Sequence, residues 1–512
     1  MVELMDPELM IKNKIIDFSD LKNRVNKAKR VVQSHGVFDL LHIGHIKHFQ
    51  AAKKYGDILV VTITPDRFVN KGPNRPRFTE TLRAEAIAAL DCVDFVIINH
   101  WPTAVEAIQL IKPFIYAKGD EYKNSENDIT GKIDIEAETV RAAGGKILFT
   151  SEVTFSSSSL LNEFFSPFSK ETISYLNDFK TKYNFQEISS YLEKSKKLRV
   201  LLIGETIIDA YRFAEVIGKS GKEPTLVAKY KHRELYAGGI LAMANHLSDF
   251  CEHITCLTYL GGNAEHENMI HNSISKNVSL EKIYKKNSPT IVKTRFLDEY
   301  LRQKLFEEYE INDDFLENDQ QNELISKMER LLKDHDIVIV ADYGHGLLND
   351  KAIDFLTQHS KYLAVNTQAN AGNNGFNCIS KYKKANYVVV ASRELQLNYR
   401  QKHLSVSEQL NRLISEHDYD QAMITNGKDG AFACKQSESI YKVPAFATAV
   451  VDRVGAGDAV LAISSLYAYH NAPSELIAFI GNVAGAEAVS IMGNKNPINK
   501  VGFMKHISCL LK

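Results

Sequence analysis

The amino-acid sequence predicts two α/β domains, the first a doubly wound parallel sheet and the second a larger α/β domain with a small β lid. Apolar runs without polar alternation recur between helical patterns, which indicates parallel strands covered on both faces. Two Lys-, Glu- and Ser-rich amphipathic segments interrupt this pattern between residues 164 and 197. A second α/β pattern starts abruptly at residue 198. We therefore expect domains at 14–163 and 198–512.

The first domain should contain five strands with helices between them. Ser19 is expected to cap a short helix that precedes them. Because ligands of doubly wound sheets bind at the carboxyl ends of the strands, polar residues at these ends are the first place to look for a site. The expected strands are 31–32, 58–63, 95–98, 114–117 and 146–149, and the expected helices are 46–55, 80–90, 104–111 and 134–143.

Residues 164–197 are expected to form a helical linker, with an additional helical layer on one domain as the alternative. In the second domain, residues 226–231 and 290–308 alternate polar and apolar side chains. Such alternation predicts half-solvated antiparallel strands, which would form the lid. The expected core strands are 198–203, 337–341, 362–365, 387–390 and 422–425.

Composition and charge narrow the possible functions. The formal net charge is −1, which gives no electrostatic attraction to nucleic acid or to an anionic membrane. No apolar run approaches the roughly 18 residues of a membrane span, and the N-terminus lacks the core of a signal peptide. Six scattered cysteines without a CxxC pair fit a reducing compartment. We expect a soluble cytoplasmic protein with no nucleic-acid and no membrane partner.

The stretch 36–45, GVFDLLHIGH, follows an apolar run and leads into a helical pattern. A strand that turns through glycine into a helix collects backbone N–H groups and a positive dipole end at one point, where a phosphate can bind. His42 and His45 are separated by Gly44, which lets the backbone approach a ligand. The two histidines could then hold a polyphosphate from the side.

This stretch resembles the GxFDxxHxGH signature of the cytidylyltransferase-like nucleotidyltransferases, which have a Rossmann-like fold. Within that family it is most similar to the adenylyltransferase half of bacterial bifunctional heptose-phosphate enzymes. The resemblance extends to a basic loop at 71–76, to the segment 118–120 and to the serines at 156–159. It implies His42, His45 and Lys71 as catalytic residues. It also implies a nucleotide site formed by Gly36, Phe38, Asp39, Arg83, Lys118, Gly119, Asp120, Ser157 and Ser158.

Other interpretations of these residues remain open. His42, His45 and His48 recur every three residues, so a zinc site is an alternative, although no acidic or cysteine partner stands at ligand spacing. Lys71 and Arg75 could form a solvated basic loop. The serines could form a flexible loop.

The stretch 451–459, VDRVGAGDA, resembles the DTxGAGD signature of the ribokinase-like sugar kinases of the PfkB family. In such a site Gly455, Ala456 and Gly457 would present backbone N–H groups to a phosphoryl group. Asp458 would accept the proton of the attacking hydroxyl. The resemblance further implies a sugar-phosphate site at Asp209, Gly238, Gly239, Lys293 and Arg295, and nucleotide contacts at Glu394, Thr425 and Gly427.

Four positions depart from the kinase pattern. Arg453 replaces the threonine of DTxGAGD, Ala242 replaces an asparagine after the double glycine, Ala391 replaces the asparagine of NxxE, and Asn366 stands where related enzymes carry aspartate. These departures suggest an altered sugar specificity or a weakened kinase. A degenerate kinase fold kept as a scaffold or regulatory module is the alternative.

Together the two matches resemble the bifunctional heptose 7-phosphate kinases/heptose 1-phosphate adenylyltransferases, with the domain order reversed. The resemblance implies that a kinase domain phosphorylates a sugar phosphate with ATP and that a transferase domain converts the sugar 1-phosphate to a nucleotide sugar for lipopolysaccharide or capsule. Mg²⁺ would accompany the nucleotide, with Glu394 as a candidate ligand, and a homodimer is expected. The alternative is a CDP-sugar or CDP-polyol synthase that uses CTP. The sequence identifies neither the base nor the sugar.

Overall fold

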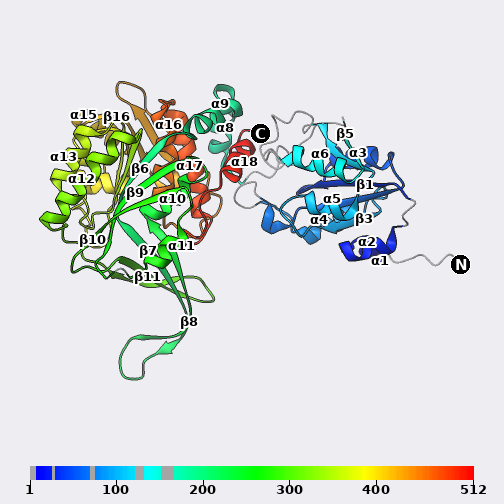
Figure 1. Ribbon diagram of the computed structural model, residues 1–512, viewed down its shortest axis with the longest axis horizontal. Helices are drawn as coiled ribbons and strands as arrows, with labels where there is room; N and C mark the ends of the chain where they lie inside the picture. Colours follow the sequence, from blue (N-terminus) through cyan, green and yellow to red (C-terminus); the bar gives the residue numbers. More distant parts are fainter. Residues whose placement is uncertain (1–6, 26–28, 70–74, 121–131, 151–166, 264) are drawn as a thin grey trace. The chain divides into compact units, whose positions relative to one another are not determined.

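The computed structural model describes residues 7–25, 29–69, 75–120, 132–150, 167–263 and 265–512. The chain divides into two compact units (Figure 1). Residues 1–169 with 504–512 form the first, and residues 170–503 form the second. No helix in the described part of the chain is long and apolar enough to cross a membrane.

The first unit is built on a parallel five-stranded sheet with the strand order β3-β2-β1-β4-β5. The chain runs outward from β1 to β3 and then returns to place β4 on the other side of β1. Ligands of open α/β sheets bind at such a switch point, here at the carboxyl ends of β1 and β4. The strands are β1 (Val31–Gly36), β2 (Ile58–Ile63), β3 (Phe95–Ile98), β4 (Ile115–Gly119) and β5 (Lys146–Thr150).

Helices cover both faces of this sheet, as the apolar runs predict. Leu59, Val61 and Ile63 of β2 belong to one buried cluster, and Ile58 and Val60 belong to another. Because neighbouring residues of a strand point to opposite faces, both faces are apolar and both are covered. The helices are α1 (Pro7–Lys14), α2 (Phe18–Arg24), α3 (Ile43–Lys53), α4 (Glu80–Ala88), α5 (Val105–Ile111) and α6 (Lys132–Ala142), with the 3₁₀ turn η1 (Asp66–Phe68). The expected cap Ser19 is wrong, since Asp17 precedes the first turn of α2.

The second unit contains a nine-stranded sheet with the order β10-β9-β6-β13-β14-β15-β16-β17-β18. The pairs from β10 to β16 are parallel, and β17 and β18 are antiparallel. The direction of the winding changes between β6 and β13. The strands are β6 (Arg199–Gly204), β9 (His253–Gly261), β10 (Val278–Lys285), β13 (Ile337–Asp342), β14 (Leu363–Thr367), β15 (Lys384–Ala391), β16 (Asp418–Thr425), β17 (Ala431–Lys435) and β18 (Tyr441–Val443).

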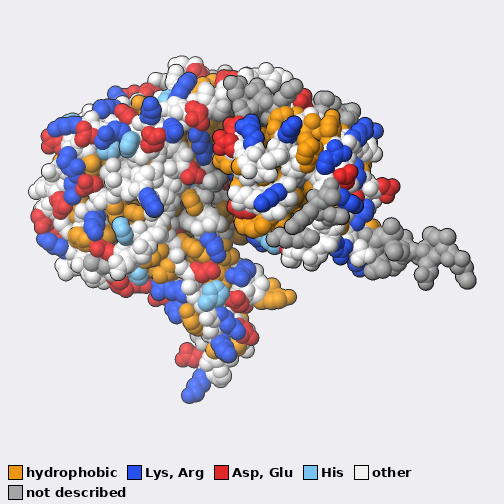
Figure 2. Space-filling view, turned by 45° about the vertical axis from the view of Figure 1, so that its right-hand side comes forward, with side chains coloured by type: hydrophobic (Ala, Val, Ile, Leu, Met, Phe, Trp, Pro, Cys, Tyr) orange, Lys and Arg blue, Asp and Glu red, His pale blue; other side chains and the backbone are white. Residues whose placement is uncertain are grey.

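The predicted lid is present as a separate four-stranded sheet with the order β12-β11-β7-β8. Strands β7 (Thr206–Lys219) and β8 (Leu226–Gly239) form a long antiparallel hairpin, and β11 (Ile291–Asp298) joins β7 in parallel and β12 (Lys304–Glu310) antiparallel. The far end of the hairpin projects from the unit (Figure 1). Side chains of both charges follow its surface (Figure 2). On this hairpin Lys231 forms an ion pair with Glu215 at 2.6 Å.

Helices complete the second unit on both sides of the large sheet (Figure 1). Helices α10 and α16 contact strands of the sheet on one side, and α12 contacts β6 and β10 on the other. The helices are α10 (Ile240–Leu247), α11 (Glu267–Ser273), α12 (Asn318–Asp334), α13 (Asp350–His359), α14 (Ser392–Tyr399), α15 (Val406–Glu416), α16 (Ala456–Tyr469) and α17 (Ser474–Val489), with 3₁₀ turns η4 (Ile379–Lys381) and η5 (Gly427–Asp429). The last helix, α18 (Lys500–Leu510), starts in the second unit, and its residues from Met504 onward are counted with the first.

The segment expected as a linker forms the helices α8 (Lys170–Lys182) and α9 (Phe185–Ser195). The ring of Phe179 stacks on Phe479 with 4.1 Å between the centroids, and the hydroxyl of Tyr467 donates to the carbonyl of Ile188 at 3.0 Å. These buried contacts make α8 and α9 an additional helical layer of the second unit. From Lys170 onward the linker interpretation is therefore wrong, and the alternative describes the segment.

Candidate active sites

The stretch 36–45 lies at the carboxyl end of β1, at the switch point of the first sheet. His42 is the residue before α3, and its Nδ1 accepts from the backbone N–H of Gly44 at 3.1 Å. The His45 ring, one turn into the helix, stacks on His42 with 3.8 Å between the ring centroids. The two predicted catalytic histidines therefore stand together at a helix N-terminus, where the positive dipole end favours a phosphate.

The ring of Phe38 packs against one of these histidines. Its ring meets His45 edge-on at 5.1 Å and Phe49 of the core at 5.0 Å, and its backbone is left-handed with φ of +50°. A Cβ atom at Gly36 would lie 2.9 Å from the Phe38 ring. Glycine is therefore required at position 36 so that the ring can reach this place. These contacts support a positioning role for both residues.

Asp39 anchors the chain that follows the basic loop. Its Oδ1 accepts from the backbone N–H of Arg77 at 2.6 Å and of Phe78 at 3.2 Å, and its Oδ2 pairs with Arg75 at 3.3 Å. The carboxylate is almost completely buried. Lys71, which the resemblance implies as catalytic, lies outside the described residues, but the chain emerging from its loop is fixed by Asp39.

Arg83 lies buried in the same region of the first unit. Its guanidinium donates to the carbonyls of Phe78 at 3.0 Å, of Thr64 at 2.9 Å and of Val37, and it pairs with Asp66 at 2.6 Å. The side chain is 1% exposed. These contacts favour a residue that joins the signature to the following strands over the predicted direct nucleotide contact.

The segment Lys118, Gly119 and Asp120 ends β4, beside the end of β1. The ammonium of Lys118 pairs with Glu136 of α6 at 2.9 Å, and the Tyr116 hydroxyl donates to the same oxygen at 3.0 Å. Burial alone would raise the pKa of Glu136, but Lys118 and the hydrogen bonds lower it overall. No motif in the sequence pointed to Glu136, because it lies within an ordinary amphipathic helix.

The third histidine of the triplet has a structural role. The Nε2 of His48 lies 2.7 Å from the hydroxyl of Ser34, and its Nδ1 lies 2.6 Å from that of Thr150. Burial, with Lys118 nearby, lowers the pKa of His48 to about 4. Within the described parts of the chain no group of three His, Cys, Asp or Glu side chains could hold a metal ion, so the zinc alternative gains no support. Ser157 and Ser158 lie outside the described residues.

In the second unit a cavity of about 270 Å³ collects most of the predicted kinase residues. Nine of them line it: Asp209, Gly239, Lys293, Arg295, Glu394, Thr425, Gly455, Gly457 and Asp458. Gly238 and Ala456 adjoin lining residues in the chain, whereas Gly427 begins η5 beyond β16. The lining also includes Tyr343, Asn366, Gln368, Arg453 and Asn494.

Gly455 is the residue before α16, with a left-handed φ of +80°. A Cβ atom there would lie 2.1 Å from Oδ1 of Asn494, so both the backbone conformation and the space require glycine. The turn delivers the N-terminus of a fourteen-residue helix to the cavity. The geometry at this end of the helix suits the predicted anion-binding loop.

Asp458 lies in the first turn of α16 and is 6% exposed. Its Oδ1 accepts from the hydroxyl of Tyr343 at 2.9 Å and from Nε2 of Gln368 at 2.7 Å. Burial raises the pKa of Asp458 to about 7, although these hydrogen bonds and Lys293 oppose the shift. A carboxylate with a pKa near neutrality suits a general base.

Asp209 stands opposite on the lid strand β7. Its Oδ1 pairs with Arg295 of β11 at 2.6 Å, and its Oδ2 accepts from Nδ2 of Asn494 at 3.0 Å. A Cβ atom at Gly238 would lie 2.2 Å from that second oxygen, which explains the glycine. At Gly239, with φ of +56°, a Cβ atom would lie 2.6 Å from the carbonyl oxygen of Glu205.

Two cations of the cavity lack a carboxylate partner within the described residues. Lys293 is 8% exposed, and its ammonium lies 5.1 Å from the centre of the Tyr309 ring. Burial lowers its pKa, and Asp209 partly opposes this. Arg453 lines the same cavity from the anion-binding loop. Arg453 is exposed, whereas Lys293 is buried. Because buried charge is costly without a counter-charge, Lys293 favours an anionic ligand.

Asp452 explains how the loop tolerates arginine at position 453. Its two oxygens accept from the hydroxyl of Tyr211 at 2.7 Å, the ammonium of Lys304 at 2.7 Å, and the backbone N–H groups of Gly493 at 3.1 Å and Val454 at 3.3 Å. Burial would raise the pKa of Asp452, but Lys304 and Tyr211 lower it overall. The loop is fixed without using the side chain of residue 453.

Glu394 does not present a free carboxylate for the suggested metal. Its oxygens accept from the backbone N–H groups of Ala369 and Ala391, both at 2.9 Å, and burial raises its pKa. These contacts fit a residue that holds two loops of the site more closely than a direct Mg²⁺ ligand.

The other two positions that depart from the kinase pattern, Ala242 and Asn366, differ in whether they line the cavity. Ala242 is buried in α10 and does not line the cavity. Asn366 lines it, with its Nδ2 donating to the carbonyl of Val389 at 2.7 Å. Its Oδ1 is buried and has no hydrogen-bond partner in the part of the chain that the structure describes, which leaves an acceptor at the cavity wall.

Comparisons with known proteins agree with these two sites. Residues 197–500 match the pfkB family carbohydrate kinases, and residues 34–192 match the cytidylyltransferase-like family. The second match extends into α9, although packing places α8 and α9 in the second unit.

The bifunctional protein HldE of Geotalea uraniireducens is 38% identical over 144 residues, 28% of each chain. HldE of Campylobacter fetus subsp. fetus is 42% identical over 130 residues, 25% of this chain and 27% of the relative. These alignments lie in the nucleotidyltransferase part and span little more than a quarter of the relatives' length.

A solved structure of phosphofructokinase-2 from Escherichia coli in complex with potassium covers 61% of this chain and 99% of its own. The TM-score is 0.50 at 15% sequence identity, a likeness of fold alone. The kinase-family match, in contrast, covers more than half of the chain. The protein therefore belongs to the pfkB family of carbohydrate kinases, and a cytidylyltransferase-like domain precedes its kinase domain.

Proposed function

We propose that the chain is a bifunctional enzyme of nucleotide-sugar biosynthesis. The second unit phosphorylates a sugar phosphate, of the heptose class, with ATP. The first unit transfers a nucleotidyl group from a nucleoside triphosphate to a sugar 1-phosphate and releases pyrophosphate. The product would supply a surface polysaccharide such as lipopolysaccharide or capsule.

One observation carries the kinase half of the proposal. A single cavity places Asp458, the Gly455–Gly457 loop and the two cations without carboxylate partners around one space. The helix N-terminus suits the transferred phosphoryl group, Asp458 suits the proton of a hydroxyl, and the cations suit a second anionic group. A neutral sugar would leave the buried ammonium of Lys293 without a counter-charge.

The kinase step follows from this arrangement. The sugar hydroxyl gives its proton to Asp458 while its oxygen bonds to the γ-phosphorus of ATP. The bond from that phosphorus to the bridging oxygen breaks, and ADP leaves. Backbone N–H groups at the start of α16 stabilise the charge on the transferred group. Mg²⁺ bound to the triphosphate would neutralise part of its charge.

The transferase step needs different groups. An oxygen of the sugar 1-phosphate bonds to the α-phosphorus, and the bond to pyrophosphate breaks. The nucleophile is already an anion, so the site has to bind and neutralise phosphates instead of removing a proton. His42 and His45 at the N-terminus of α3 are suited to this task. Lys71, Ser157 and Ser158 remain predicted contributors to the same site.

Two alternatives are less well supported. A degenerate kinase domain would not need Asp458 with its hydrogen-bond donors and the glycine loop, all of which are kept. A CDP-sugar or CDP-polyol synthase would use the same folds, so only substrate preference separates it from the proposal.

The test uses the whole chain in two assays. Formation of ADP is measured with ATP and a panel of sugars and sugar phosphates. Release of pyrophosphate is measured with ATP, CTP or GTP and a panel of sugar 1-phosphates. We expect ADP formation with a sugar phosphate but not with its unphosphorylated sugar, and pyrophosphate release with ATP. A clear preference for CTP would support the CDP alternative.

Each unit supplies the control for the other. Asp458→Asn should abolish ADP formation and leave pyrophosphate release unchanged, whereas His45→Ala should do the reverse. If wild-type protein forms ADP no faster than Asp458→Asn with any substrate, the kinase assignment is wrong. If His45→Ala releases pyrophosphate at the wild-type rate, the transferase assignment is wrong.

A further inference from the structure

The carboxylate of Asp458 is held asymmetrically. Both of its hydrogen-bond donors, the Tyr343 hydroxyl at 2.9 Å and the Gln368 amide at 2.7 Å, reach Oδ1. Within the described residues no hydrogen bond to Oδ2 is present. One oxygen is thus fixed by the protein and the other is left for a ligand of the cavity that Asp458 lines.

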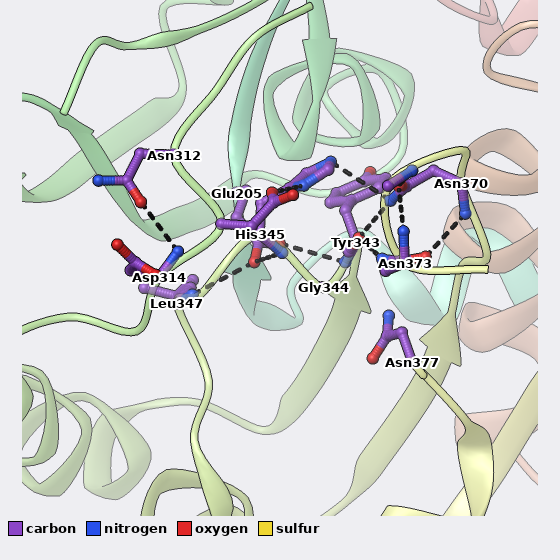
Figure 3. Close-up of polar contacts among 12 residues, drawn as sticks. Glu205, Asn312, Asp314, Tyr343, Gly344, His345, Leu347, Asn370, Asn373 and Asn377 are labelled. Atoms are coloured by element: carbon purple, nitrogen blue, oxygen red, sulfur yellow. Dashed lines mark hydrogen bonds and ion pairs between the residues drawn. The ribbon is translucent and has the colours of Figure 1, made fainter. Parts of the chain in front are cut away.

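The first donor is positioned through its backbone. The N–H of Tyr343 donates to Oε2 of Glu205 at 3.1 Å. Its carbonyl accepts from Nδ2 of Asn370 at 2.8 Å and from Nδ2 of Asn373 at 2.7 Å. Figure 3 shows these side chains converging on the turn after β13. The tyrosine backbone is therefore restrained on both sides.

Glu205 restrains the rest of this turn. Its Oε1 accepts from the backbone N–H of His345 at 3.0 Å and of Leu347 at 3.3 Å. The side chain is 1% exposed, at the end of β6, the neighbour of β13 (Figure 3). One buried carboxylate thus collects three N–H groups from a single turn, which fixes where the Tyr343 side chain begins.

The second donor comes from the adjacent strand. Gln368 follows β14, and its backbone N–H donates to the carbonyl of Asp342 at 2.9 Å. Its own carbonyl accepts from Nδ2 of Asn377 at 3.2 Å. The two donors therefore leave neighbouring strands, β13 and β14, and meet at one oxygen of Asp458.

We propose that Tyr343 and Gln368 are positioning residues for the kinase reaction, which hold Asp458 by Oδ1 so that Oδ2 accepts the proton of the sugar hydroxyl. This inference rests on the proposed function of the second unit. The Glu205 carboxylate and the asparagines after β14 restrain the backbone of these two residues.

The two hydrogen bonds also favour the charged form of Asp458, so their loss should raise its pKa. Other groups around the cavity act on the same carboxylate and stay in place in the variants below. Asp209 raises the pKa of Asp458, and Lys293 lowers it. The remaining charged side chains that line the cavity are Arg295, Glu394 and Arg453.

The test replaces each donor by a side chain of similar size, in Tyr343→Phe and Gln368→Met. Loss of one hydrogen bond should raise the pKa of Asp458 by about one pH unit, a tenfold change in its acidity. The acidic limb of kcat/KM for sugar phosphate should move upward by the same amount, and the limb of the double variant should move further. Binding of ATP should change less than twofold.

Tyr382→Phe is the matched control. It also removes a buried hydroxyl, but that hydroxyl donates to Asp342 at 2.7 Å and not to Asp458. The acidic limb of kcat/KM for sugar phosphate should lie at the same pH in Tyr382→Phe as in the wild type. Thermal unfolding of each variant separates a lost fold from a lost contact. Because the Gln368 side chain is only partly buried, its variant decides the question if Tyr343→Phe fails to fold.

A second readout does not depend on activity. The carboxyl carbon of Asp458 is titrated by NMR in protein with ¹³C-labelled aspartate, and its signal is assigned by its loss in Asp458→Asn. A higher pKa in both variants supports the inference even if no substrate of the panel reacts, in which case the proposed function fails alone. An unchanged pKa in both variants, or an equal shift in Tyr382→Phe, overturns the inference.

Discussion

The two candidate sites use the same structural device in different ways. In each, a glycine-containing turn brings the N-terminus of a helix, α3 or α16, to the carboxyl end of a parallel sheet. In the first unit the helix start carries two stacked imidazoles. In the second it carries a glycine loop with one buried carboxylate, Asp458.

The difference matches the nucleophile proposed for each reaction. A sugar 1-phosphate is already anionic, and the carboxylates near the first helix, Asp39 and Glu136, are occupied by the loop and by Lys118. A sugar hydroxyl has to lose a proton, and Asp458 keeps one oxygen for it. The comparison teaches that a helix N-terminus accounts for phosphate binding, while the side chains of its first turn decide the chemistry.

The largest expected effect is that of Asp458→Asn on the kinase reaction. Removing the base should lower kcat by about three orders of magnitude, the range of general-base catalysis. The rate of ADP formation in single-turnover experiments measures the effect. A loss below about tenfold would show that proton removal does not limit the reaction, and would break the proposed contrast between the sites.

His45→Ala should lower kcat of the transferase reaction by about two orders of magnitude, through loss of charge stabilisation in the transition state. Pyrophosphate release with a saturating sugar 1-phosphate measures it. The effect should be nearly independent of pH above neutrality if His45 binds phosphate. If the wild-type pH profile has an acidic limb that is missing in His45→Ala, His45 would act as a base. That result would contradict the proposed division of tasks between the two sites.

Lys293→Met should raise the KM for the sugar phosphate about tenfold to a hundredfold, because a charge-assisted contact to the substrate anion is lost. The KM for ATP should stay within about threefold. Lys229→Met, on the exposed part of β8, is the control and should change neither value. An unchanged KM for the sugar phosphate would show that Lys293 does not recognise the anion.

The smallest expected effect is on pH dependence. Because burial raises the pKa of Asp458 to about 7, the base is protonated below neutrality. The kinase kcat/KM should be fully present above this pKa and fall about tenfold per pH unit below it. The dissociation constant of ATP is measured over the same pH range. If it stays constant, the limb does not arise from a change in the affinity for ATP. Full activity at pH 5 would contradict the assignment.

Much of this architecture could be predicted from local sequence. The apolar run 58–63 is a strand with the expected bounds, and the alternation in 226–231 and 290–308 does mark the lid. Short-range patterns succeed where strand and helix periodicity differ and where glycine is required by backbone geometry, as at Gly455.

The rest depended on long-range contacts. Arg83 was predicted at the nucleotide, but its guanidinium joins the carbonyls of Val37 and Thr64 and the carboxylate of Asp66, which are distant in the chain. Gln368 carries no motif, and its importance arises because β14 lies beside β13. The helices α8 and α9 read as a linker because their buried partners, such as Phe479, lie some 300 residues later.

Asp452 has a consequence for how this enzyme can change. Its four hydrogen bonds come from the lid, from the loop at Gly493 and from its own turn, and none involves the side chain that follows it. The shape of the phosphate loop and the choice of side chain at position 453 are therefore separate properties. Under the proposed function, the side chain at position 453 can therefore change, by evolution or by engineering, while the glycine loop keeps its form.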